Sequence, residues 1–231
     1  THPNATSYGA QPGGTASGPL KDIATGAPTS IALTTTAVSS PHFGGQGAWP
    51  AGGTDAYETF NGYVDFSAGD YTSIELAASS GQTYSHQFTG LDTADSFAYD
   101  FAGTFVRGES SYLDRWTLVE LQGADSAVPA HGTGSGVVVL GPTRVAMCLG
   151  DNGAADQGYV ARWTDIDPGA DGEFAVVQSQ YTEGAGAGGS KGYGFGAIRL
   201  EVVSLASQPY LKRIGSIDNN SAVDWVRETA G

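Results

Sequence analysis

Four carboxylates around one turn form the clearest cluster of metal-ligating side chains in the sequence. Asp165, Asp167, Asp171 and Glu173 surround a Pro-Gly dipeptide. Carboxylate oxygens are the hard ligands that calcium prefers, so these four residues are predicted to hold a calcium ion. Their spacing is not that of an EF-hand loop, and aspartate and glycine are also common in tight turns that bind nothing. Calcium is therefore the one cofactor that the sequence suggests.

Two glycine-rich strings match catalytic or cofactor-binding motifs without the required context. Residues 188–192 fit G-x-S-x-G, and residues 184–189 fit G-x-G-x-x-G. The first motif needs a strand before it and a helix after it, and the second needs a βαβ unit. Both strings lie in a glycine run between predicted strands, so we interpret them as a flexible loop. The four histidines are scattered without the spacing of a zinc site. We predict that the chain is not an enzyme.

Three aromatic residues lie outside the regular strand pattern and are candidates for contacts with sugars. Trp49, Tyr57 and Tyr63 occur in irregular segments, and an exposed ring can pack against the CH groups of a pyranose. Packing over the end of the core is the alternative for all three rings. Asn4 and Asn219 each begin an N-x-S/T sequon, so they are the predicted glycan acceptors in a secreted protein.

Two arginines alternate with core-type neighbours in predicted strands of an acidic protein. A partly buried guanidinium needs its donors satisfied, so at least one of Arg115 and Arg162 is predicted to pair with a carboxylate such as Asp114 or Asp165. The single cysteine, Cys148, lies in an apolar stretch and is interpreted as a small buried side chain.

Composition excludes several classes of partner. The chain has 231 residues, 35 of them glycine, and only 15% are charged, which disfavours a helical protein. The formal net charge of −14 repels phosphate backbones, so no nucleic-acid partner is predicted. No apolar run approaches the roughly 20 residues of a membrane span, so no membrane insertion is predicted. Few lysines, abundant glycine, threonine and serine, and a start at Thr1 favour an extracellular or cell-surface protein.

Apolar and polar residues alternate with a period of two through most of the chain. In residues 96–102 the rings of Phe97, Tyr99 and Phe101 alternate with small or polar residues. This period is typical of antiparallel strands with one buried face. The predicted strands are residues 30–38, 73–77, 83–89, 96–106, 115–122, 136–140, 144–149, 158–166, 172–180 and 195–203. Short strands separated by glycine, aspartate and asparagine turns predict an all-β protein, an antiparallel β-sandwich of the jelly-roll type.

The two ends of the chain differ from this pattern. We predict an extended N-terminal segment at residues 1–40, a β-sandwich domain at residues 41–205 and a short C-terminal tail at residues 206–231. Residues 1–28 contain almost no large apolar side chain and should be disordered when alone. Residues 221–228 fit either one short helix capped by Ser221 or an extra strand.

Three segments carry a resemblance to a known family. They are FTGLD at residues 88–92, DRWTLVELQGAD at residues 114–125 and GYVARWTDIDPGADGEF at residues 158–174. These segments resemble a jelly-roll domain of secreted bacterial surface proteins, which is similar in layout to malectin-like and carbohydrate-binding modules. The resemblance covers residues 56–203 and implies a β-sandwich at the cell surface. Such domains occur in adhesins, enzyme accessories and structural proteins, and no catalytic motif accompanies them.

The predicted strand at residues 30–38 gives the main functional expectation. An extended segment can pair with an open sheet edge, and pairing with the next copy of the chain would build a head-to-tail filament. We predict an extracellular structural protein of this kind, in which Ile31, Leu33 and Val38 fill pockets of the neighbouring copy. The alternative is a carbohydrate-binding module or adhesin domain, whose partner is a glycan. A segment docked on a neighbour favours the filament, and one docked on its own domain beside an aromatic-lined groove favours sugar binding.

Overall fold

The computed structural model describes residues 2–6, 8, 13–66, 72–94, 96–184, 186–204, 211–213 and 225–227. In these residues the chain is almost entirely β, and its strands pair in antiparallel sheets. The predicted all-β antiparallel sandwich is confirmed, while the jelly-roll connectivity stays a prediction.

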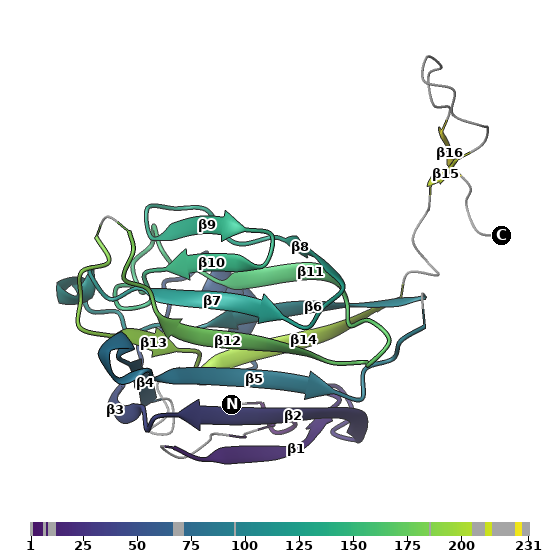
Figure 1. Cartoon of the computed structure of the whole chain (residues 1–231), viewed down its shortest axis with the longest axis horizontal. Helices are drawn as coiled ribbons and strands as arrows, with labels where there is room; N and C mark the ends of the chain where they lie inside the picture. The colour runs from purple at the N-terminus through teal and green to yellow at the C-terminus, as the bar shows by residue number, and fades with distance from the viewer. Residues whose placement is uncertain are drawn as a thin grey trace.

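Seven strands form the larger sheet, in the order β1-β2-β5-β12-β7-β10-β9. Figure 1 shows this sheet running from β1 at one edge to β9 at the other. The strands are Thr15–Lys21 (β1), Pro28–Val38 (β2), Thr83–Thr89 (β5), Phe174–Gln180 (β12), Thr117–Gln122 (β7), Arg144–Met147 (β10) and Val137–Gly141 (β9).

Smaller sheets complete the fold. One has the order β14-β6-β11-β8, another the order β13-β4-β3, and β15 pairs with β16. The strands are Ala197–Ser204 (β14), Phe97–Thr104 (β6), Ala161–Asp167 (β11), Ser126–Pro129 (β8), Gly192–Gly194 (β13), Thr72–Leu76 (β4), His42–Gln46 (β3), Leu211–Arg213 (β15) and Trp225–Arg227 (β16). The helix α1 is Asp55–Phe60, and two 3₁₀ turns are η1 (Ala78–Ser80) and η2 (Ser110–Tyr112). At residues 225–227 the strand, not the helix, is therefore the alternative that the structure supports.

Aromatic side chains fill the space between the seven-stranded and four-stranded sheets. Phe88 of β5 and Phe101 of β6 meet across the layers with ring centroids 5.9 Å apart. Trp163 of β11 lies beside Phe101 and is fully buried. Burying an aromatic side chain of this size removes well over 100 Å² from water, which makes these rings the main stabilising contacts of the core.

A separate buried cluster contains the single cysteine. Cys148 packs with Trp116 and Tyr181, and only 4% of it is exposed. Its Sγ lies 3.4 Å from the carbonyl oxygen of Leu113, and burial raises the pKa of the thiol. The interpretation of Cys148 as a buried small side chain is therefore confirmed.

The N-terminal segment provides the first two strands of the larger sheet. β1 pairs with β2, and β2 pairs with β5 of the same chain. Residues 15–21 are therefore a strand in the intact chain, where β2 supplies the partner that an isolated segment lacks. Disorder of the segment when alone stays a prediction. Ile31 and Leu33 are buried in the core of their own sandwich, whereas Val38 at the strand end is 47% exposed.

Helix α1 was not predicted, because six residues are too short to show a helical period. Thr54 caps it, and the Thr54 Oγ1 accepts a hydrogen bond from the Tyr57 backbone N–H. Gly158 lies directly under the cap at a φ of +80°, and a Cβ there would clash with Thr54. Its carbonyl oxygen accepts a hydrogen bond of 2.9 Å from the Ala56 N–H. These contacts fix the start of α1 against the loop that leads into β11.

Candidate ligand-binding site

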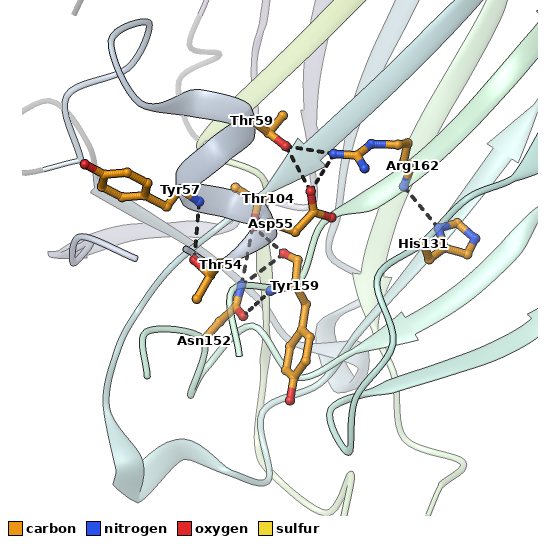
Figure 2. A network of polar contacts seen from close by, with 9 residues as sticks. All are labelled: Thr54, Asp55, Tyr57, Thr59, Thr104, His131, Asn152, Tyr159 and Arg162. Carbon is orange, nitrogen blue, oxygen red and sulfur yellow. Dashed lines mark hydrogen bonds and ion pairs between the residues drawn. The ribbon is translucent and has the colours of Figure 1, made fainter. Parts of the chain in front are cut away.

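An ion pair between α1 and β11 anchors one side of the site. The Nη2 of Arg162 donates to Asp55 Oδ1 and to Thr59 Oγ1, both at 2.7 Å (Figure 2). Thr59 Oγ1 in turn donates to Asp55 Oδ1 at 3.1 Å. The prediction that Arg115 or Arg162 pairs with a carboxylate is confirmed, but the partner is Asp55 rather than Asp114 or Asp165.

Arg115 satisfies its donors differently. Its guanidinium lies 3.3 Å from the centroid of the Tyr112 ring, a cation–π contact, and its Nη1 donates to the hydroxyl of Tyr193. Arg115 therefore belongs to the packing around β13 and not to the ion pair.

His131 supports the backbone of Arg162. Its Nδ1 accepts a hydrogen bond of 3.0 Å from the Arg162 N–H, and its ring packs edge-on against Trp163. Burial, together with the nearby charge of Arg162, lowers the pKa of His131 to about 4. The imidazole is therefore neutral at pH 7, which leaves Nδ1 free to accept this bond.

Asn152 holds the loop beneath α1. The side chain is fully buried, and its Nδ2 donates to the carbonyl oxygens of Phe105 and Tyr159 at 3.0 and 3.2 Å. Its Oδ1 accepts from the backbone N–H of Gly158 at 2.9 Å and from that of Tyr159 at 2.6 Å, the second of which is drawn in Figure 2. One amide thus ties the end of β6 to the loop that contacts α1.

A polar hollow of about 160 Å³ lies on the outer face of the four-stranded sheet beside α1. Alternation places one set of side chains of β6, β11 and β14 outward, while the aromatic set faces the core. Cross-strand pairing makes Arg199 a neighbour of Ala102, and Glu201 a neighbour of Asp100. The hollow is lined by Thr59, Asp100, Phe101, Ala102, Arg162, Arg199 and Glu201.

Opposite charges alternate within this hollow, which we call the β6–β14 pocket. Arg199 pairs with Glu201, and Asp100 Oδ1 accepts a hydrogen bond of 3.0 Å from the Asp165 N–H. Burial raises the pKa of Asp100, and the charges of Asp165 and Glu201 add to this effect, while the Asp165 N–H and Arg162 oppose it. Two guanidinium groups and two carboxyl groups line the hollow and thus present donors and acceptors side by side.

One of the three predicted sugar-contacting rings adjoins the pocket. The guanidinium of Arg199 lies 5.5 Å from the centroid of the Tyr63 ring, which is 37% exposed. Trp49 instead packs edge-on against Phe66, and Tyr57 on α1 points away from the network (Figure 2). Tyr63 is therefore the ring that a ligand in the β6–β14 pocket can reach.

Three of the four predicted calcium ligands have other hydrogen-bond partners, two of them within their own turn. Asp167 Oδ1 accepts from the Gly169 N–H, Asp171 Oδ1 from the Glu173 N–H, and Glu173 Oε2 from Gln87. A hollow of about 300 Å³ contains Asp165 and Asp167 but neither Asp171 nor Glu173. In the part of the chain that the structure describes, no three histidine, cysteine, aspartate or glutamate side chains are placed to share a metal ion.

The remaining predicted residues lie elsewhere. The Asn4 side chain donates to the carbonyl oxygen of Ile23, and Asn219 lies outside the described residues. Ser190, in the G-x-S-x-G string, lies in the loop before β13 and is followed by that strand rather than by a helix. Both strings thus lack the structural context that their motifs need.

Replacing Arg162 with methionine should destabilise the sandwich by about 1–2 kcal/mol, because Asp55 and Thr59 lose a charged partner in a half-buried position. Urea unfolding of the variant measures the change. Arg144→Met is the matched control, since Arg144 pairs with Glu120 on the opposite sheet and is more exposed. Equal effects of the two substitutions would contradict an anchoring role for Arg162.

The fold and the site define an all-β antiparallel sandwich with a polar pocket on its four-stranded sheet. No protein-family model matches the sequence, and no curated protein or solved structure matches it either. Among the described residues, no helix has the length and apolar character needed to cross a membrane.

Sequence reasoning missed most of the β6–β14 pocket. The alternation of residues 198–201 in the sequence is enough to place Arg199 and Glu201 on the face opposite Ile198 and Leu200. It did not show that β6 lies between β14 and β11, which is what brings Asp100 to the same site.

Proposed function

We propose that this chain is a glycan-binding module that takes a neutral sugar in the β6–β14 pocket. Hydroxyl groups both donate and accept hydrogen bonds, so a sugar can use the guanidinium donors of Arg162 and Arg199 and the carboxylate acceptors of Asp100 and Glu201 together. The single observation that carries the proposal is this alternation of donors and acceptors in one hollow beside the exposed Tyr63 ring.

The charge of the pocket favours a neutral ligand. Arg162 is already paired with Asp55, and Arg199 with Glu201, so a phosphate or carboxylate would have to displace a carboxylate from its arginine. The formal net charge of −14 adds a general repulsion of anions.

Two further points support the proposal. The N-terminal segment is docked on its own domain, which is the first part of the arrangement expected for sugar binding; the β6–β14 pocket is lined mainly by polar side chains rather than by aromatic rings. The resemblance to carbohydrate-binding and malectin-like modules points the same way. We propose a binding role without a chemical step, at the cell surface or outside the cell.

The test is a glycan array, followed by calorimetry, with the full chain and the variant Arg199→Ala. Loss of charged hydrogen bonds to the sugar should weaken binding about 10-fold or more. Arg144→Ala is the matched control, because it removes an arginine from a similar exposed pair with Glu120 on the other sheet. Absence of binding to every neutral glycan, or equal loss in both variants, would refute the proposal.

A further inference from the structure

We propose that the β1–β2 hairpin exchanges between two copies of this chain, with Ser39 and Ser40 as the hinge. In the exchanged form, β2 of one copy pairs with β5 of the other and makes the contacts that it makes within a single chain. The inference does not rest on glycan binding, because the hairpin belongs to the seven-stranded sheet and the β6–β14 pocket to the four-stranded sheet. The two regions touch where the His2 N–H donates to the Tyr63 carbonyl oxygen at 2.8 Å.

The two hinge residues adopt an unfavourable backbone conformation. Ser39 and Ser40 have φ values of +57° and +51°, and only one other non-glycine residue among those described has a positive φ. Left-handed backbone costs a residue with a Cβ on the order of 1 kcal/mol or more. Ser40 also precedes Pro41, and a residue before proline prefers an extended conformation. Opening the hinge into an extended chain therefore relieves strain at two consecutive residues.

The closed hinge is held by one side chain of the body. The Nε2 of Gln82 donates to the carbonyl oxygens of Ser39 and Ser40, at 3.3 and 3.0 Å. Gln82 lies just before β5, so this contact joins the end of β2 to the strand beside it. This contact opposes opening at the hinge itself, and the His2 N–H bond to the Tyr63 carbonyl oxygen, 2.8 Å long, must also break when the N-terminal segment leaves.

The hairpin is a separable unit at the edge of the sheet. β1 lies at the edge and pairs with β2, so both strands leave together. The inner face of β2 buries Ile31, Leu33, Thr35 and Ala37, and a hairpin that left would expose these side chains and the edge of β5. A second copy is the partner that offers the identical β5 edge and the identical pockets.

The energetic balance follows from this identity. Contacts between the hairpin and the body are the same in the closed and exchanged forms, so they cancel in the comparison. Two terms remain: relief of the hinge strain favours the exchanged form, and the entropy lost on association opposes it. Reciprocal exchange closes a two-fold dimer, whereas exchange passed from copy to copy extends a chain, which is the assembly expected from Ile31 and Leu33.

Paired cysteines provide the test. Thr34 of β2 lies opposite Gln87 of β5. We would mix one copy that carries only Thr34→Cys with another that carries only Gln87→Cys, warm the mixture below its melting midpoint, and oxidise it. A covalent dimer of the two copies is expected, because only exchange places these cysteines together. Pairing Thr34→Cys with Leu113→Cys, an exposed position on another loop, measures random collision.

Hinge variants give the second arm. The double variant Ser39→Gly, Ser40→Gly removes the strain and should lower the dimer fraction about 10-fold. Ser40→Pro cannot adopt a positive φ and should raise the dimer fraction, as measured by light scattering after size exclusion. The proposal would be overturned if the Thr34→Cys and Gln87→Cys pair gave no more covalent dimer than the Thr34→Cys and Leu113→Cys control. This outcome does not depend on whether the proline variant folds. A dimer fraction that the glycine variant leaves unchanged would also overturn the proposal.

Discussion

Replacing His86 with phenylalanine should reduce the loss of stability that we expect as the pH falls. His86 lies on β5 inside the core, 4% exposed, between the rings of Tyr84 and Phe195. Neither ring nitrogen has a hydrogen-bond partner among the described residues. Burial lowers the pKa of His86 from 6.5 to about 3.

The direction of the effect follows from proton binding in the two states. The unfolded chain binds a proton at His86 below pH 6.5, whereas the folded chain stays neutral there until about pH 3. Stability contributed by the neutral histidine is thus complete above pH 6.5 and is lost as the pH falls, by roughly 1.4 kcal/mol per pH unit and on the order of 5 kcal/mol by pH 3.

Urea unfolding at intervals from pH 8 to pH 4 measures this slope. The phenylalanine variant should match or exceed the parent in acid and lie close to it at pH 8. The exposed His42 is the control position, and His42→Gln should leave the core contribution intact. A His86→Phe variant with the parent's full acid slope would show that other groups cause the loss.

Replacing Asn152 with alanine should destabilise the fold by about 3–5 kcal/mol. The change leaves the N–H groups of Gly158 and Tyr159 and the carbonyl oxygen of Phe105 without their side-chain partner in a buried position. The loop that supports α1 should loosen at the same time, so sugar affinity in the β6–β14 pocket should also fall.

Thermal unfolding and calorimetry with the proposed sugar measure these two effects. Asn61→Ala is the control, because Asn61 is exposed at the end of α1 and contributes a backbone N–H to the cap, which alanine retains. A melting temperature of Asn152→Ala equal to that of Asn61→Ala would contradict the role assigned to the buried amide.

Strands with strict alternation were predictable from the sequence. Residues 83–89 read as a strand because Tyr84, His86 and Phe88 alternate with polar residues, and β5 has these bounds. β1 lacks this signal, since Leu20 is its one large apolar side chain and it lies at a sheet edge with no buried residue. β13 is three residues long, too short for any period.

The site was less predictable than the strands. Asp55 and Arg162 are 107 residues apart, and nothing local to either residue indicates the other. The polar faces of β6 and β14 could be assigned from alternation, but the β6–β14 pocket depends on which strands are neighbours. Strand order is set by packing of the whole sandwich, which a single sequence does not display.

Because Cys148 is buried, its reactivity toward thiol reagents reports on unfolding of the sandwich around it. Thiol reagents attack an exposed thiolate, and Cys148 is both enclosed and held in its neutral form. It packs with Trp116 and Tyr181, residues that have no part in the β1–β2 hairpin. Labelling with a thiol dye therefore proceeds only as fast as this part of the sandwich opens. Unfolding of the whole domain makes the cysteine reactive, while movement of the hairpin alone leaves it protected, so one native residue separates the two processes.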